Sequence, residues 1–253
     1  MRWLAVREQR RCCAGGWVLS LSVGAGGCAT QQVTVPLIPP FIPAPRPPIV
    51  WTEPFTILDP QRWREVEVRG QTQYAITVLE DRTCLQATSR GGASILLSAV
   101  RFDPEDYPWI SWDWRVDRLV EGEALQRKEG SDAAARLYVY FESKGLPWQK
   151  RNLDYVWSAS LPVGTILSSA YSSESKIIVV ESGPAHLGQW RSIQRNLEED
   201  YEQCFGDDPP DVIAIGLMTD TDNTASHALA YFDELRISRL PAPRQQADQE
   251  NLP

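Results

Sequence analysis

The sequence predicts an all-β protein, a two-sheet jelly-roll sandwich with one amphipathic helix. Short runs in which apolar and polar residues alternate recur along the chain, and Gly, Asp and Arg separate them. Closely spaced short strands of this kind are typical of a β-sandwich. Apolar residues at helical spacing form one convincing stretch, roughly residues 190–205, and Gly206 offers a C-cap directly after it.

Length and composition favour one folded domain. The chain has 253 residues, of which 43% are hydrophobic, and it contains ten tryptophans. A chain of this length can bury one good core, and no second change of composition marks another domain boundary. The formal net charge is −8. An acidic chain is a poor nucleic-acid binder, so we expect no nucleic-acid partner.

Residues 1–27 have the features of a secretory signal peptide. Four arginines precede a mostly apolar segment, residues 12–25, which is too short to cross a membrane and ends in small residues. The segment Ala25-Gly26-Gly27-Cys28 resembles a bacterial lipobox, in which the cysteine becomes the lipidated first residue of the mature protein. We therefore expect an exported chain that is anchored to a membrane through a lipid on Cys28.

A proline-rich linker follows the lipidated cysteine and completes residues 28–50. Such a run favours the extended polyproline conformation and acts as a semi-rigid spacer. Ala29 is compatible with outer-membrane sorting, because an inner-membrane retention signal usually places Asp there. We expect an outer membrane lipoprotein that faces the periplasm, with the β-sandwich domain at residues 51–240 and a disordered tail at residues 241–253.

Two stretches have the clearest strand pattern. In residues 109–116 the inward face by alternation consists of Ile110, Trp112, Trp114 and Val116. In residues 133–141 the same rule turns Arg136, Tyr138 and Tyr140 outward. We expect these two strands to be neighbours, so that Asp113 and Arg136 form a pair on their shared outward face. Further strands are expected at residues 74–79, 84–88, 93–97, 153–158 and 176–181.

Residues 212–237 contain an apolar run, an acidic turn and the last strand. The apolar run, residues 212–218, is rich in β-branched residues, which suits a strand buried on both faces. Polar residues at its end, residues 219–224, suggest a site. The same sequence also suits a simple hairpin, because Asp, Asn and Thr satisfy turn backbone by local hydrogen bonds. Both interpretations remain open at the level of the sequence.

The candidate ligand-binding residues are polar or aromatic side chains at strand ends and on outward faces. They are Asp113, Asp132, Arg136, Tyr138, Tyr140, Trp157, Asp220, Asp222 and Asn223. The charged residues form either a buried ion-pair network that locks the sheet or the polar floor of a ligand site. The aromatic residues either fill the core or form a platform that stacks on sugar rings. We expect the site where the loop before Asp132 meets the 219–224 turn.

The sequence predicts neither a metal centre nor a catalytic residue. The two histidines lack metal-ligand spacing, and motifs for a nucleophilic serine, a phosphate loop or a dinucleotide are missing. Asp220, Asp222 and Asn223 offer oxygen ligands for Ca²⁺, but the glycine and the distal glutamate of an EF-hand loop are absent. Asp233 is an equally weak calcium candidate. We therefore expect no cofactor and prefer a structural turn.

The cysteines that follow Cys28 leave two alternatives. Cys84 and Cys204 either pair in an oxidising compartment or remain separate buried thiols. A pair that closes so long a loop would stabilise the fold by several kcal/mol. No geometry in the sequence decides between them.

Five separate stretches resemble one protein family. They are residues 112–116, 132–136, 154–157, the pairs 200–201 and 205–206, and residues 218–224. In order and spacing they are similar to the bacterial family called domain of unknown function 3047, over roughly residues 55–237. The resemblance implies an exported protein without an assigned activity, so no catalytic residue carries over. The closing stretch, residues 231–237, is also similar to the last strand of galactose-binding-like jelly rolls.

Three functional classes fit these features. The preferred class is a non-catalytic envelope lipoprotein that binds a saccharide or another polar envelope component. One alternative is a carboxylate-dependent glycan hydrolase, which needs two carboxylates about 5 to 10 Å apart in one cleft. The other is a purely structural envelope protein. Exposed aromatic side chains would favour the binding class. The features together favour a protein without catalytic activity.

Overall fold

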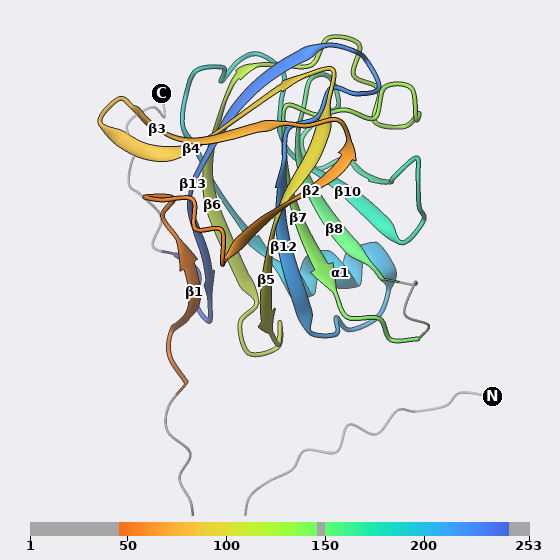
Figure 1. Ribbon diagram of the computed structural model, residues 1–253. Helices are drawn as coiled ribbons and strands as arrows, with labels where there is room; N and C mark the ends of the chain where they lie inside the picture. Colours follow the sequence, from red (N-terminus) through yellow and green to blue (C-terminus); the bar gives the residue numbers. More distant parts are fainter. Residues whose placement is uncertain (1–45, 146–149, 243–253) are drawn as a thin grey trace, which may run out of the picture. The chain divides into compact units, whose positions relative to one another are not determined.

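Two β-sheets and one helix make up the folded part of the chain (Figure 1). The computed structural model describes residues 46–145 and 150–242. One sheet has six strands, which are β1 (Ile49–Glu53), β3 (Gln73–Leu79), β4 (Arg82–Arg90), β6 (Trp109–Arg118), β11 (Arg191–Asn196) and β13 (His227–Ser238). The other has seven, which are β2 (Trp63–Arg69), β5 (Ala93–Phe102), β7 (Ala135–Phe141), β8 (Asn152–Ser158), β9 (Ile166–Ser168), β10 (Ser175–Ser182) and β12 (Val212–Met218). The helix α1 comprises Leu197–Phe205.

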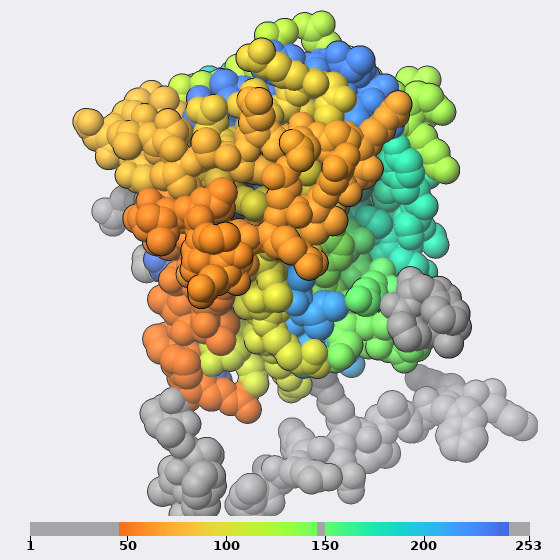
Figure 2. Space-filling view, viewed as in Figure 1, coloured from red at the N-terminus to blue at the C-terminus, as the bar shows by residue number. Residues whose placement is uncertain are grey.

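The strands pair mostly with partners that are distant in the sequence. The six-stranded sheet has the order β11-β6-β13-β4-β3, with β1 paired to β13, and the seven-stranded sheet has the order β2-β5-β12-β7-β8-β10-β9. The pairing of β8 with β10 is parallel, whereas β12 is antiparallel to both β5 and β7. In the space-filling view the orange and yellow segments around β1 to β5 cover much of one side (Figure 2). This architecture confirms the predicted two-sheet jelly-roll sandwich with one helix.

Alternating apolar residues build the core between the sheets. On β6, Ile110, Trp112, Trp114 and Val116 are each 2% exposed or less, which confirms the predicted inward face. The ring of Trp114 lies 6.1 Å from the ring of Trp157 on β8, and this contact joins the two sheets. Full burial of a large apolar side chain contributes roughly 1.5–3 kcal/mol. Apolar burial between the layers is therefore the main stabilising term of the sandwich.

The helix is shorter than the sequence pattern predicts. The prediction of a helix over residues 190–205 is wrong in its first part, because Arg191–Asn196 form β11 at the edge of the six-stranded sheet. The side chain of Asn196 accepts hydrogen bonds from the backbone N–H groups two and three residues further on. It thereby satisfies donors that lack a partner within the helix. Gly206, at a φ of 78°, ends the helix in the expected left-handed C-cap.

The acidic segment 219–224 connects the two sheets. Strand β12 lies between β5 and β7 in the seven-stranded sheet, whereas β13 lies between β4 and β6 in the six-stranded sheet. The hairpin interpretation is therefore wrong, because this segment is a crossover between layers. The central place of β12 agrees with the predicted burial on both faces, since residues 215–218 are all buried.

Strands β6 and β7 are not neighbours, which corrects another prediction. Strand β6 pairs with β11 and β13, and β7 pairs with β8 and β12. The alternation within each strand correctly gave its inward face. It carries no information about the partner strand, because the partner is chosen by contacts between residues far apart in the chain.

The remaining predictions concern the cysteines and the chain ends. Cys84 and Cys204 are separate thiols, which confirms the unpaired alternative. Within the part of the chain that the structure describes, no helix is long and apolar enough to cross a membrane. The predicted signal peptide, Cys28, most of the proline-rich linker and the tail from residue 243 onward lie outside the described residues.

Candidate functional site

Arg136 is the centre of a polar cluster on the outward face of the seven-stranded sheet. The residue is 3% exposed, and its guanidinium donates in three directions. Nε donates to Asp220 Oδ1 at 2.9 Å, Nη1 to Asp154 Oδ2 at 2.6 Å and Nη2 to the Ser131 carbonyl at 2.8 Å. Asp154 lies on β8, next to β7, whereas Asp220 and Ser131 lie in loops. One side chain therefore ties two paired strands to two loops.

Hydrogen bonds on both sides hold the crossover segment 219–224. The Thr219 hydroxyl donates to the Ala134 carbonyl at 2.8 Å, and the Thr72 hydroxyl donates to the Thr219 carbonyl at 2.7 Å. The backbone N–H of Thr221 donates to the Gly92 carbonyl at 3.0 Å. Thr219 and Thr221 are both 0% exposed. Because buried polar groups require partners, these contacts give the two threonines a structural role.

Asp132 locks the end of the loop before β7. Its Oδ1 accepts from the backbone N–H of Asn223 at 3.2 Å and from the side-chain amide of Asn223 at 2.8 Å. Its Oδ2 accepts from the backbone N–H and the hydroxyl of Thr224, both at 2.7 Å. A carboxylate offers about four acceptor positions, and each of them is used here. Asp132 therefore shapes the crossover and has no position left for a ligand.

A pocket of about 410 Å³ opens beside the Arg136 cluster. Its lining includes Arg136, Tyr138, Asp154, Tyr171, Asp220, Asp222 and Asn223. The ring of Tyr138 stacks on the ring of Tyr140, with centroids 5.6 Å apart and planes 19° apart. Tyr171 is 57% exposed, and its hydroxyl donates to Asn223 Oδ1 at 2.7 Å, so it forms a rim of the pocket. Seven of the nine predicted ligand residues therefore lie in or directly beside one pocket.

The pocket contains a carboxylate oxygen without a partner. Asp154 is 2% exposed, and its Oδ1 accepts no hydrogen bond from any residue that the structure describes. Its other oxygen is held by Arg136. A buried acceptor without a donor costs roughly 1–3 kcal/mol. Asp154 Oδ1 thus marks a position at which a bound molecule would be stabilised if it donates a hydrogen bond.

Burial raises the pKa of both carboxyl groups beside Arg136. Burial raises the pKa of Asp220 to about 7, although the Arg136 guanidinium opposes the rise. Burial also raises the pKa of Asp154, again against Arg136. One positive charge serves two buried carboxyl groups, so it cannot fully offset the desolvation of both.

The acidic residues of this region fit a calcium site poorly. Carboxylate oxygens of Asp132, Asp220 and Asp222 lie within 4.8 Å of one another. However, Asp132 uses its acceptor positions within the loop, and Asp220 Oδ1 accepts from both Arg136 and the backbone N–H of Ala133. Calcium takes roughly six to eight oxygen ligands. The group therefore suits a hydrogen-bonded crossover better than a calcium centre.

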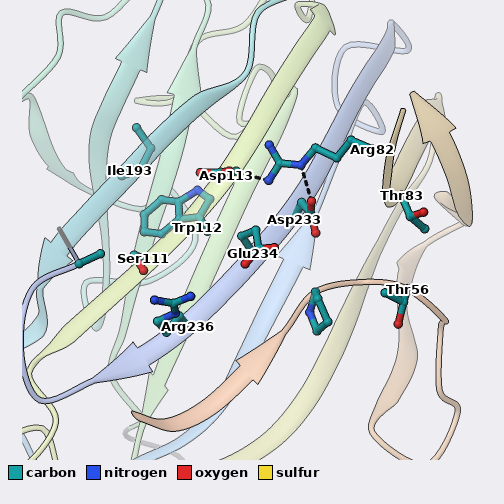
Figure 3. A pocket seen from close by; sticks show the side chains of 12 residues that line it. Thr56, Arg82, Thr83, Ser111, Trp112, Asp113, Ile193, Asp233, Glu234 and Arg236 are labelled. Carbon is teal, nitrogen blue, oxygen red and sulfur yellow. Dashed lines mark hydrogen bonds and ion pairs between the residues drawn. The ribbon is translucent and has the colours of Figure 1, made fainter. Parts of the chain in front are cut away.

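Two predicted site residues lie elsewhere in the fold. Asp113 is on β6 in the other sheet and pairs with Arg82, so the predicted Asp113–Arg136 pair is wrong (Figure 3). Trp157 is 0% exposed in the core, and its Nε1 donates to the Gly183 carbonyl at 3.1 Å. It cannot belong to an aromatic platform, because β8 turns it towards the opposite sheet.

Asp154, Ser131 and Tyr171 lie outside the set predicted from the sequence. The pattern of β8 contained a signal for Asp154, because an inward Trp157 places residues of the opposite parity outward. Ser131 contributes its backbone carbonyl, which no side-chain pattern reveals. Tyr171 lies in the loop between β9 and β10, and only the folded chain brings it to Asn223.

Comparisons with known proteins match this chain to one protein family and to solved structures of low similarity. The sequence matches the family described as "Protein of unknown function (DUF3047)" over residues 61–236. No curated protein matches the sequence.

Solved structures share the sandwich architecture only at low similarity. The CBM22-1 xylan-binding domain from Paenibacillus barcinonensis Xyn10C is 15% identical, with a TM-score of 0.36, and the alignment covers 77% of this chain and 96% of that domain. The Trichoderma harzianum endoglucanase 3 from family GH12 is 8% identical, with a TM-score of 0.38, and the alignment covers 70% of this chain and 97% of that enzyme. Similarity at this level assigns neither a ligand nor an activity to this chain.

Replacement of Arg136 by Ala should strongly destabilise the fold. The change leaves two buried carboxyl groups without their counter-charge, and breaking a buried ion pair in this way costs about 3–5 kcal/mol. Urea denaturation followed by circular dichroism measures the loss. The matched control is Arg101→Ala, which removes an exposed ion pair to Glu142 and should leave stability nearly unchanged. Equal stability of the two variants would show that the Arg136 cluster is not a buried lock.

Asp220 should make the free energy of unfolding decrease as pH rises. Its pKa is about 7 in the folded protein, against about 3.9 in an unfolded chain. Between these values the folded protein holds a proton that the unfolded chain has released. This difference stabilises the fold at low pH, and the stabilisation is lost as pH rises through about 7.

The variant Asp220→Asn tests this dependence, because it mimics the protonated acid. Its stability relative to the wild type should increase between about pH 4 and pH 7 and level off above that, as measured by urea denaturation at each pH. The control Glu67→Gln changes an exposed carboxylate on β2 and should show a constant difference. A constant difference for Asp220→Asn as well would contradict the raised pKa.

Proposed function

This chain belongs to the family described as "Protein of unknown function (DUF3047)", and since that description assigns no activity, we propose a function from the site itself. The protein is a non-catalytic module that binds a saccharide, or a similarly hydroxyl-rich envelope component, in the pocket beside Arg136. For convenience we call this pocket, lined by Arg136, Tyr138, Asp154, Tyr171 and Asp220, the Arg136 pocket.

The unpartnered Oδ1 of Asp154 is the observation that carries this proposal. A carboxylate oxygen only accepts hydrogen bonds, so the group that satisfies it must be a donor. Saccharides present many hydroxyl donors at short spacing. Asp222 offers a further acceptor at the same wall of the pocket. The three aspartates of the lining outnumber its two arginines, Arg69 and Arg136, so a hydroxyl-rich ligand matches the lining better than an anion.

The aromatic residues and the size of the pocket support the same proposal. Tyr138 and Tyr140 form a stacked pair on the outward face of β7, and Tyr171 stands exposed at the rim. Aromatic faces at a polar pocket provide flat apolar surface, which suits the C–H faces of a sugar ring. The volume of about 410 Å³ lies within the usual range for small-ligand sites, roughly 300–1,000 Å³.

One observation favours the hydrolase alternative, and another opposes it. The pKa of about 7 at Asp220 is a suitable value for a general acid. However, Asp220 and Asp154 both bind the same guanidinium, and Asp220 Oδ1 accepts two hydrogen bonds from the protein. A hydrolase requires its two carboxyl groups to face the scissile bond from separate positions. The shared guanidinium favours a fixed polar floor over an acid–base pair.

The cellular setting that we propose is the periplasmic face of an outer membrane. The basic, apolar and small-residue order that ends at Cys28 supports export and lipidation. The proline-dense run before β1 would then act as a spacer between the lipid and the sandwich. A module on such a spacer is suited to contact saccharides of the envelope.

Saccharide binding is tested with a glycan array followed by titration calorimetry on the best-retained glycan. Asp154→Asn should weaken binding roughly tenfold or more, because it removes a charged acceptor. Tyr171→Ala should weaken it roughly two- to tenfold through lost stacking. Arg101→Ala, on β5 and outside the pocket lining, is the matched control and should bind like the wild type.

The calorimetry and one activity assay separate the three classes. Retention of no glycan by the folded wild type would contradict the proposal and leave the structural role. Unchanged affinity in both pocket variants would place binding elsewhere. Release of new reducing ends from the bound glycan would favour the hydrolase instead.

The lipid anchor is tested by replacing Cys28 with Ser. The wild type, expressed with its own signal, should partition with membranes, whereas Cys28→Ser should be released or remain unprocessed, because serine offers no thiol for lipidation. Membrane fractionation and mass spectrometry of the mature N-terminus measure both outcomes. A wild-type protein that is soluble in the periplasm and cleaved before Cys28 would show that the anchor proposal is wrong.

A further inference from the structure

A second, larger pocket lies on the outward face of the six-stranded sheet (Figure 3). Its volume is about 720 Å³, and strands β4, β6 and β13 supply all of its charged lining residues. The charged residues that line it are Arg82, Asp113, Asp233, Glu234 and Arg236. This pocket is on the opposite layer from the Arg136 pocket, so its chemistry is independent of the function proposed above.

A bulge in β13 places two consecutive acidic side chains on the same face. The register with β6 shifts between Asp233, which is opposite Asp113, and Arg236, which is opposite Ser111. Glu234 has a φ of 49° and is exposed, while the next residue, Leu235, returns to the core. A non-glycine residue in this conformation persists only where its surroundings hold it. The bulge therefore concentrates negative charge on the floor of the pocket.

Arg82 only partly compensates this charge. Its Nη2 donates to Asp113 Oδ2 at 2.5 Å, and its Nε donates to Asp233 Oδ2. The guanidinium also lies 4.2 Å from the ring centre of Trp190, which fixes its place (Figure 3 shows it between the two carboxylates). Asp233 is 3% exposed, and its Oδ1 accepts no hydrogen bond from the residues in the described ranges. One cation thus serves two carboxylates, and one buried oxygen still lacks a donor.

Arg236 adds an unpaired positive charge to the same pocket. Its side chain is half-buried at the pocket, and within residues 46–145 and 150–242 it forms neither a hydrogen bond nor an ion pair. It lies opposite Ser111, two residues along β6 from Asp113. The pocket therefore presents an unsatisfied acceptor and an unpaired guanidinium on the same outward face of the sheet.

We infer that this pocket binds a small zwitterion, an amino acid or a short peptide, with its ammonium group at Asp233 and Asp113 and its carboxylate at Arg236. An ammonium group donates to carboxylate oxygens, and a carboxylate can accept two parallel hydrogen bonds from a guanidinium. A neutral sugar offers no anion to Arg236.

The probe is L-alanyl-L-alanine, compared with two blocked forms of the same dipeptide. N-acetyl-Ala-Ala lacks the ammonium group and Ala-Ala-amide lacks the carboxylate, while size and shape change little. Titration followed by NMR of the tryptophan indole signals should report binding, because the ring of Trp190 packs on the Arg82 guanidinium of the pocket. We expect the free dipeptide to bind, and each blocked form to bind roughly tenfold more weakly or worse.

Two variants separate the charged ends of the site. Asp233→Asn should abolish the advantage of the free dipeptide over N-acetyl-Ala-Ala, and Arg236→Gln should abolish its advantage over Ala-Ala-amide. Arg101→Ala, on β5 and outside both pocket linings, is the matched control and should leave dipeptide binding unchanged. If Asp233→Asn proves unfolded by circular dichroism, Arg236→Gln alone decides, since Arg236 holds no contact that the fold requires. Failure of the free dipeptide to bind, or equal binding of the free and blocked forms, would overturn the inference.

Discussion

The buried guanidinium of Arg136 is the interaction on which the site depends. It joins β7 to β8 and holds two loops through three hydrogen bonds. One of those loops is also the crossover that carries the chain from β12 to β13. The contact that shapes the pocket therefore also fixes the connection between the layers. Because a charge without its partner is costly in a medium of low polarity, the whole arrangement is held as a unit.

The two outward faces of the sandwich carry the same kind of arginine–aspartate group, and the two groups differ in burial. On each face an arginine bridges two aspartates, Arg136 with Asp154 and Asp220, and Arg82 with Asp113 and Asp233. The side chain of Arg136 is 3% exposed under its loops, whereas that of Arg82 is 27% exposed. Each group leaves one aspartate oxygen without a donor. Their neighbours differ, since tyrosines flank the first group and an unpaired guanidinium flanks the second. Different ligand chemistry follows from that difference.

Part of the site was predictable from the sequence. The outward face of β7 and the polar crossover 219–224 follow from local patterns, and together they contain five of the residues that line the pocket, which are Arg136, Tyr138, Asp220, Asp222 and Asn223. Strand β8 was harder, because its seven residues are all buried and the contrast between its faces is weak. This is why Trp157 was placed on the ligand side. Asp113 was misplaced for another reason. Alternation correctly placed it on the outward face of its strand, but that strand belongs to the six-stranded sheet and not to the sheet of Arg136.

The sequence by itself determined which side of each strand is apolar, where the helix ends and which segments are polar. These features are local: alternation has a period of two, and a C-cap requires a glycine such as Gly206 at one position. Only the tertiary structure decided that β12 and β13 lie in different layers, that Arg136 meets Asp154 and Asp220, and that Tyr171 reaches Asn223. The two contacts of Arg136 join residues that are 18 and 84 positions apart, and the contact of Tyr171 joins residues that are 52 positions apart. Strand pairing of this kind is set by the packing of the whole core, because an isolated strand has the same alternation whichever partner it finds.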